Sequence, residues 1–186
     1  MLRPDLPIET SRLVLRLFTP DDLTELHSFY SLPEVARFLY WEPRDLVQVR
    51  TVLTDKAATA ELTDEGQVLC LAVTLRETGA LIGEVLLFWR SREHRQGEIG
   101  YVFHPGHHGK GYATEATAEV LRLGFEGLDL HRIVARCDGR NTASTKVMER
   151  LGMRKEAHLV ENEMVKGEWT DEIVYAVLRR EWPPAR

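Results

Sequence analysis

The feature that most constrains this chain is the stretch from Tyr101 to Ala116, which reads YVFHPGHHGKGYATEA. It begins as a strand, ends that strand at a Pro-Gly pair, and places two glycines just before a run with helical periodicity. Glycine tolerates positive φ and lets the backbone approach a ligand closely. The first N–H groups of a helix have no internal partner and lie at the positive end of the helix dipole. The stretch therefore predicts a strand, an anion-binding turn and a helix in succession.

Two common phosphate-binding motifs are excluded by the residues around these glycines. Tyr112 follows Gly111, so no Ser or Thr stands after a Gly-Lys pair as a P-loop requires. The third glycine or alanine of a dinucleotide fingerprint is also missing at the required spacing. On this motif alone, a plain strand–turn–helix connection that binds nothing stays open.

Composition and charge limit the classes of protein to consider. A chain of 186 residues with a net charge of −5 suggests one domain and argues against a general nucleic-acid binder. The N-terminus lacks the apolar core of a signal peptide, and no run reaches the roughly 18 apolar residues of a membrane span. Cys70 and Cys137 lie in apolar runs and are predicted to be buried free thiols. We therefore expect a cytoplasmic protein.

The hydrophobic pattern predicts an α/β (α+β) fold with a mixed sheet of about seven strands and helices on both faces. The strands at 96–103 and 131–138 are separated by a helix, so they should be parallel. The predicted strands span residues 12–18, 67–75, 80–89, 96–103, 131–138, 153–164 and 172–178, and the predicted helices span residues 19–30, 32–39, 45–62, 113–127 and 141–151.

A second motif lies about thirty residues after the glycines, where Asp138 to Met153 reads DGRNTASTKVMERLGM. Asn141 and Ser144 are three residues apart, so they share one face at the start of a helix. Asn is also a preferred N-cap residue, and the motif alone leaves open that Asn141 only caps this helix.

The two motifs together resemble the GNAT superfamily of N-acetyltransferases, whose phosphate loop reads Gln/Arg-x-x-Gly-x-Gly/Ala. His108 stands where the family has Gln or Arg, a minor departure because that loop binds largely through backbone N–H groups. Residues 9–16 and 171–175 are similar to the RimJ/RimL-like branch, which contains ribosomal-protein N-terminal acetyltransferases. The resemblance covers about residues 9–182. It implies a single domain with a mostly antiparallel sheet and one splayed parallel pair, whose gap receives the acetyl arm.

The resemblance also implies acetyl-CoA as cofactor and assigns residues to it. Ser144 would supply a proton to the leaving thiolate. No metal is expected, because the histidines around Pro105 have no carboxylate or thiolate partner. The residues assigned to the cofactor are Tyr101, Val102, Phe103, His108, Gly109, Lys110, Gly111, Tyr112, Ala113, Thr114, Asn141 and Ser144.

Acetyl transfer to an amine requires a base. An α-amino group has a pKa of about 7.7–8.0 and a lysine about 10.4, so deprotonation at pH 7 costs about 1.4 and 4.6 kcal/mol respectively. Glu163 is the first candidate, because it lies at the spacing from Ser144 at which the ribosomal-protein enzymes carry their base. Glu98 is the second, and Glu161 is expected to share the face of Glu163. The amine would attack directly, without a covalent acetyl-enzyme.

Two further parts of the site are expected, an oxyanion donor at the splayed end of the strand at 96–103 and a pair of aromatic residues for the substrate. The backbone N–H of Val102 or Phe103 would stabilise the oxyanion. Tyr40 and Trp41 fall where the family places substrate-binding residues, although they can equally fill the edge of a core.

The acceptor amine stays open at this stage. It could be a protein N-terminus, with alanine or serine first, or a small molecule such as an antibiotic, a polyamine or an amino acid. A non-catalytic acyl-CoA sensor is the alternative from another class. A monomer and a homodimer are both compatible with the sequence.

Overall fold

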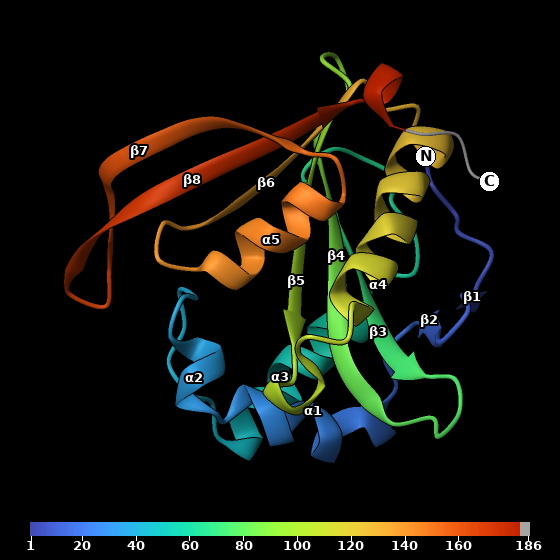
Figure 1. The fold of residues 1–186 in the computed structure, drawn as a ribbon. Helices are drawn as coiled ribbons and strands as arrows, with labels where there is room; N and C mark the ends of the chain where they lie inside the picture. Colours follow the sequence, from blue (N-terminus) through green and yellow to red (C-terminus); the bar gives the residue numbers. More distant parts are fainter. Residues whose placement is uncertain (183–186) are drawn as a thin grey trace.

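A single eight-stranded sheet runs through the computed structural model, which describes residues 1–182. The strand order is β1-β2-β3-β4-β5-β6-β8-β7, and β5–β6 is the parallel pair (Figure 1). The strands are β1 Ile8–Glu9, β2 Leu13–Arg16, β3 Val68–Leu75, β4 Leu81–Ser91, β5 Gln96–Phe103, β6 Arg132–Asp138, β7 Arg154–Val165 and β8 Glu168–Leu178. The helices are α1 Leu23–Tyr30, α2 Pro33–Ala36, α3 Leu46–Ala57, α4 Tyr112–Arg122 and α5 Thr142–Arg150.

The predicted mixed, mostly antiparallel sheet is confirmed, with one strand more than expected. The additional strand is β1, which pairs with β2 and lies before the first predicted strand at residues 12–18. A strand of two residues is too short to carry a periodic pattern, so it could not be predicted from the hydrophobic pattern. Helix α3 ends at Ala57, five residues before its predicted end at residue 62, and α4 continues as a π-helical turn over Leu123–Gly127.

Alternate residues of the central strands pack into two separate cores, one on each face of the sheet. On β3, Leu69 and Leu71 join the core beneath α4 and α5. Cys70 and Ala72 join the core beneath α1 and α3. Helices therefore cover both faces, as predicted.

The parallel pair comes apart along its length. Strands β5 and β6 are paired only from Gln96 opposite Arg132 to Ile99 opposite Ala135. Beyond this point β5 continues to Phe103, while β6 continues to Asp138 and pairs only with β8. Figure 1 shows β6 leaning away from β5 towards the long β7–β8 hairpin. The splayed gap expected from the resemblance is therefore present.

Two observations bear on the class of protein. Cys70 and Cys137 are both free thiols, and Cys70 is buried, as predicted; Cys137 is only half-buried, because it lines a pocket. Among residues 1–182, no helix has both the length and the apolar character needed to cross a membrane.

Candidate active site

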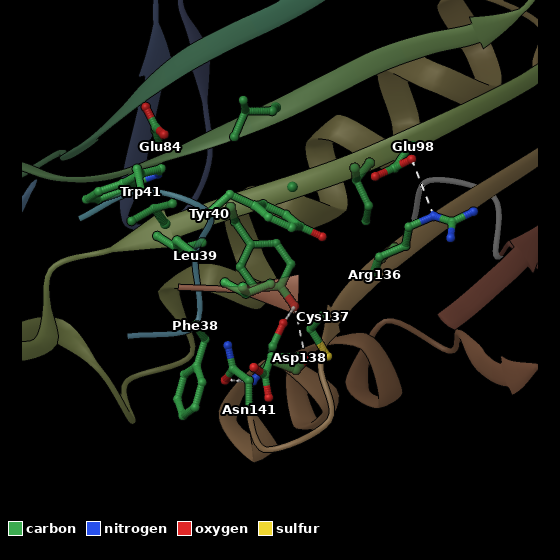
Figure 2. Close-up of a pocket in the computed structure, with 18 of the residues that line it drawn as sticks. Phe38, Leu39, Tyr40, Trp41, Glu84, Glu98, Arg136, Cys137, Asp138 and Asn141 are labelled. Atoms are coloured by element: carbon green, nitrogen blue, oxygen red, sulfur yellow. Dashed lines mark hydrogen bonds and ion pairs between the residues drawn. The ribbon is translucent and has the colours of Figure 1, made fainter. Parts of the chain in front are cut away.

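A pocket of about 510 Å³ opens where β5 and β6 separate. Its walls come from five parts of the chain: the ends of these two strands, the start of α5, the segment from α1 to α3, strand β4 and the β7–β8 hairpin. Figure 2 shows Glu98 and Arg136 paired on one side of it, and Cys137, Asp138 and Asn141 on another. The splay of one strand pair thus creates the cavity.

The glycine turn adopts the predicted geometry. Gly109 and Gly111 have φ values of +77° and +81°, in the left-handed region that favours glycine. Gly111 is the N-cap of α4 and has no side-chain cap, so the N–H groups at the start of the helix are not covered by one. No heavy atom lies within 4 Å of the position that a Cβ on Gly109 would take, and the buried hydroxyl of Thr114 has no hydrogen-bond partner among the described residues.

The register of β5 separates the two expected backbone donors. The N–H of His104 bonds the carbonyl of Ile82 on β4 at 2.9 Å. Because alternate residues of a strand direct their N–H groups to opposite sides, the N–H of Val102 also points to β4, opposite Glu84. The N–H of Phe103 faces the gap. Between the two candidates for oxyanion donor, the register favours Phe103.

Asn141 caps α5, which is one of the two roles that the sequence left open for it. Its Oδ1 accepts a hydrogen bond from the N–H of Ser144 at 3.1 Å. The cap leaves the Asn141 NH₂ group on the pocket wall, where it makes no hydrogen bond within the described residues. Capping and ligand binding are therefore compatible for this residue.

Ser144 faces Tyr101 across the gap. The Tyr101 hydroxyl lies 2.8 Å from Ser144 Oγ and 3.0 Å from the Ser144 carbonyl oxygen. Burial raises the pKa of Tyr101 above its ordinary value, so the phenol keeps its proton at neutral pH. This contact connects β5 to α5, and it was not expected from the sequence.

The Cys137 thiol lies on the same pocket wall. Burial raises the pKa of Cys137 to about 11, with Ser144 acting in the opposite direction. A thiol with this pKa is protonated at neutral pH, which argues against Cys137 as a nucleophile.

Glu163 and Tyr40 meet at the pocket mouth. The Tyr40 hydroxyl donates a hydrogen bond to Glu163 Oε2, joining the α2–α3 loop to the β7–β8 hairpin. Lys166 reinforces this junction, because its Nζ bonds the carbonyl oxygen of Ala36 at 2.7 Å. Burial, followed by the bond to Glu163, raises the pKa of Tyr40 above its ordinary value. Glu163 has no basic partner among the described residues.

The other two carboxylates expected near the site are placed differently. Glu98 lines the pocket, but its Oε2 lies 3.0 Å from Arg90 Nε and 3.7 Å from Arg136 Nε. Glu161 does not line the pocket and has a φ of +48°. The irregularity between Leu159 and Glu163 breaks strand alternation, so spacing alone does not place Glu161 on the face of Glu163.

Trp41 lies where it can serve both roles expected for it, substrate binding and packing at the edge of the core. It lines the pocket, and its ring also packs against Tyr30 with a centroid distance of 4.6 Å. The Arg44 guanidinium lies 4.8 Å from the centre of the Trp41 ring. The loop aromatics thus fill a core edge and face the cavity together.

A buried ion pair on the pocket wall was not expected from the sequence. Lys56 Nζ lies 2.8 Å from Glu84 Oε2, and the Tyr30 hydroxyl bonds Glu84 Oε1 at 2.6 Å. Burial alone would lower the pKa of Lys56, but Glu84 raises it above its ordinary value. Both residues sit in runs that read as an ordinary helix and strand, so only the helix–sheet packing brings them together.

No three His, Cys, Asp or Glu side chains within residues 1–182 come together as a metal site. This includes the histidines of the glycine turn, where the His108 ring nitrogen Nε2 lies 3.0 Å from the Phe103 carbonyl oxygen.

Comparison with known proteins gives one family. The model of the acetyltransferase (GNAT) domain matches residues 12–154. An uncharacterized N-acetyltransferase, YnaD, of Bacillus subtilis is 33% identical over 94% of this chain and 98% of its own. The [ribosomal protein uS5]-alanine N-acetyltransferase of Escherichia coli is 30% identical over 47% of this chain and 45% of its own.

Solved structures agree with the sequence matches. A GNAT-family acetyltransferase from Bacillus anthracis superposes with a TM-score of 0.84, is 32% identical, and covers 94% of this chain and 99% of its own. The spermidine N-acetyltransferase of Vibrio cholerae, solved with CoA and spermine, superposes with a TM-score of 0.77 at 25% identity over 92% of this chain and 98% of its own.

Proposed function

The chain belongs to the GNAT family of acetyltransferases, and from this premise we propose that it acetylates the N-terminal amine of a polypeptide at the pocket between β5 and β6. The observation that carries the proposal is the convergence on one cavity of Ser144, Tyr101 and Glu163, three residues from separate elements. Acetyl-CoA, the cofactor of this family, supplies an acetyl thioester when bound.

The residues present fit this cofactor. The turn at Gly109 and Gly111 offers N–H groups and open space to a diphosphate, and the unpartnered Thr114 hydroxyl is one more donor beside it. Asn141 presents its NH₂ group at the start of α5. The unpaired edge of β5 offers the N–H groups of Tyr101 and Phe103 to an extended arm. These groups would hold the cofactor, together with the other residues assigned to it from the sequence.

Glu163 is proposed as the base. The acceptor arrives as an ammonium, and Glu163 accepts its proton, directly or through a water molecule. Among the three carboxylates considered, the proposal is supported by its place at the pocket mouth and by the absence of a basic partner in the described residues. Glu98 is less suited, because Arg90 and Arg136 already engage its carboxylate.

Ser144 is proposed to hold a proton for the departing sulfur. Tyr101 has one hydroxyl proton and two acceptors within 3.0 Å, Ser144 Oγ and the Ser144 carbonyl. When Tyr101 donates to Oγ, the proton of Ser144 is free to turn into the pocket. Tyr101 would thus orient the acid of the reaction.

The polypeptide acceptor is favoured by a second cavity of about 640 Å³ that shares Tyr40, Glu98 and Glu163 with the first. This cavity extends across β5, β6 and β8, and Arg90 and Arg132 also line it. A small amine needs only the first cavity. A chain that continues beyond its first residue would occupy both.

A polyamine is the second candidate, and it rests on charge. Seven acidic and three basic side chains line the first cavity. An excess of carboxylates attracts a substrate with several ammonium groups. The Vibrio cholerae spermidine N-acetyltransferase has a similar fold.

The proposal also covers the extent of the domain, the location of the protein and its oligomeric state. Residues 9–182 act as one domain, which the continuous sheet supports. The two free cysteines are consistent with a reducing cytoplasm. The working form is a monomer or a homodimer.

A turnover screen tests the proposal. Thiol release from acetyl-CoA is measured with N-terminal peptides beginning with Ala or Ser, with spermidine, with aminoglycosides and with free amino acids. We expect the highest kcat/KM for a peptide of several residues. A higher kcat/KM for spermidine would select the polyamine reading. Tight CoA binding without turnover of any amine would favour a sensor.

A further inference from the structure

The N-terminal residues 10–12 contact the start of α4, about one hundred positions away in the sequence. Glu115, in the first turn of α4, is the centre of this contact. Its Oε1 accepts hydrogen bonds from Thr10 Oγ1 at 2.6 Å, from Ser11 Oγ at 2.9 Å and from the Arg12 backbone N–H at 3.0 Å. Residues 9–16, which are similar to the RimJ/RimL-like branch, have no role in the proposed reaction itself.

Glu115 stays charged in this network. Burial alone would raise the pKa of Glu115, but the hydrogen bonds from Thr10, Arg12 and Ser11 together lower it below its ordinary value. Its Oε2 accepts from Arg12 Nε at 2.7 Å and lies 2.6 Å from Arg12 Nη2. The carboxylate thus fixes the plane of the Arg12 guanidinium.

The same guanidinium reaches the glycine turn. Arg12 Nη1 donates to the carbonyl oxygen of Lys110 at 2.9 Å, between the two left-handed glycines. Its central carbon lies 4.7 Å from the centre of the Tyr112 ring, on the first residue of α4. Arg12 Nη2 also lies 3.5 Å from the position that a Cβ on Gly111 would take. One side chain therefore bonds Lys110 and packs on Tyr112, the residues on either side of Gly111.

The turn needs such support because of its own composition. Glycine loses more conformational freedom on ordering than any other residue. Gly111, the N-cap, contributes no side-chain hydrogen bond to the helix start. A turn that is already ordered before the ligand arrives binds more tightly, because its ordering entropy is not lost on binding.

We propose that Arg12, held by Glu115, is a positioning residue for the anionic diphosphate of coenzyme A, because it fixes residues 109–112 in the form that presents their N–H groups. This inference rests on the proposed cofactor site. It adds to that site a residue from the N-terminal segment, about one hundred positions before the glycine motif.

Coenzyme A itself is the probe, and calorimetry measures its Kd for the wild type and for variants. We expect R12A to raise the Kd about tenfold, the effect of one charged hydrogen bond. R12K keeps the charge but lacks the planar set of N–H donors that bonds Lys110 and Glu115 together. It should therefore raise the Kd nearly as much as R12A does. E115Q is a milder change that keeps an acceptor oxygen, and we expect about a threefold rise from the weaker bond to Arg12.

R76A is the matched control. Arg76 is also an exposed arginine bound to the N-terminal segment, through the carbonyl oxygen of Thr10 at 3.4 Å and Glu9 at 3.2 Å, but it does not touch the turn. Its Kd for coenzyme A should equal that of the wild type. A rise in Kd for R76A as large as that for R12A would show a general effect of the N-terminal segment and overturn the proposal.

Amide hydrogen exchange of the free protein supplies a readout that does not depend on turnover. R12A should accelerate exchange at residues 109–114 and leave α5 unchanged, while the KM for the acceptor stays constant. Wild-type affinity for coenzyme A in R12K would mean that Arg12 acts only as a charge, and would overturn the positioning role. If the wild type itself binds no coenzyme A, the cofactor site fails, which is a separate result.

Discussion

The two ends of the proposed active site are built in different ways. The cofactor end is the glycine turn, which is not among the residues that line the pocket, and its proposed binding groups are backbone amides, at Gly109, Gly111 and the first residues of α4. The acceptor end is made of side chains from segments far apart in the sequence, including Tyr40 and Glu163. Main-chain binding tolerates side-chain change, whereas a side-chain site depends on each residue. The comparison predicts that substitutions at the acceptor end cost most.

The largest effect should follow Glu163→Gln. Removing a general base costs about 10²- to 10⁴-fold in rate, so we expect kcat/KM for the acceptor to fall by at least about a hundredfold while the Kd for coenzyme A is unchanged. Steady-state kinetics and calorimetry measure the two quantities. Glu161→Gln is the matched control, because this residue lies two positions away outside the pocket. Equal losses in both variants would contradict the assignment.

Lys56→Met tests the buried ion pair on the pocket wall. It leaves Glu84, which is 1% exposed, without its positive partner. We expect a loss of about 3 kcal/mol in the free energy of unfolding, measured by urea denaturation. Arg3→Met removes the exposed partner of Glu61 and should cost below about 1 kcal/mol. A K56M protein as stable as the wild type would show that the pair is not a structural requirement of the acceptor end.

Tyr101→Phe tests whether Tyr101 orients Ser144. Losing the hydroxyl should lower kcat about tenfold, the value of one hydrogen bond, and leave the KM for acetyl-CoA unchanged. Tyr175→Phe is the control, because the Tyr175 hydroxyl is also hydrogen-bonded, to Glu149 at 2.9 Å, but faces another part of α5. An unchanged kcat in Y101F would remove Tyr101 from the mechanism.

Gly111→Ala tests the backbone of the cofactor end. A Cβ has space there, since its nearest neighbour is 3.5 Å away, but φ of +81° strains any other residue. The free turn of the variant can relax out of this form, so about 1 kcal/mol is needed to restore it on binding, and the Kd for coenzyme A should rise about fivefold. Gly152→Ala has a similar φ of +75° at the end of α5, and should reduce stability alone. Equal Kd values in G111A and G152A would contradict a requirement for the left-handed form at residue 111.

His108→Ala should have the smallest effect. Its ring bonds the Phe103 carbonyl oxygen at 3.0 Å, and the N–H groups of the turn do not depend on this side chain. We expect the Kd for coenzyme A to change by less than about threefold. A loss above about tenfold would mean that the His108 side chain itself binds the cofactor, against a turn that acts through its N–H groups.

The same contrast explains what the sequence could predict. The glycine turn, the parallel pair and the N-cap at Asn141 are local patterns, and the structure has all three. The Tyr101–Ser144 contact joins residues forty-three positions apart, and only the strand splay brings it about.

Contacts between distant segments were missed for the same reason. Lys56 meets Glu84 because α3 packs on β4, and Arg12 meets Glu115 because β2 lies near α4. The irregularity in β7 between Leu159 and Glu163 has no sequence signature, so the relation of Glu161 to Glu163 could not be read by counting.

One measurement tests the central claim most directly, that backbone amides of the turn hold the cofactor. The ¹H–¹⁵N spectrum is recorded while coenzyme A is added. We predict the largest amide shifts at Gly109, Gly111, Tyr112, Ala113 and Thr114, with a further shift at Phe103. If these amide signals do not move and the largest shifts occur on another part of the surface, the account is contradicted.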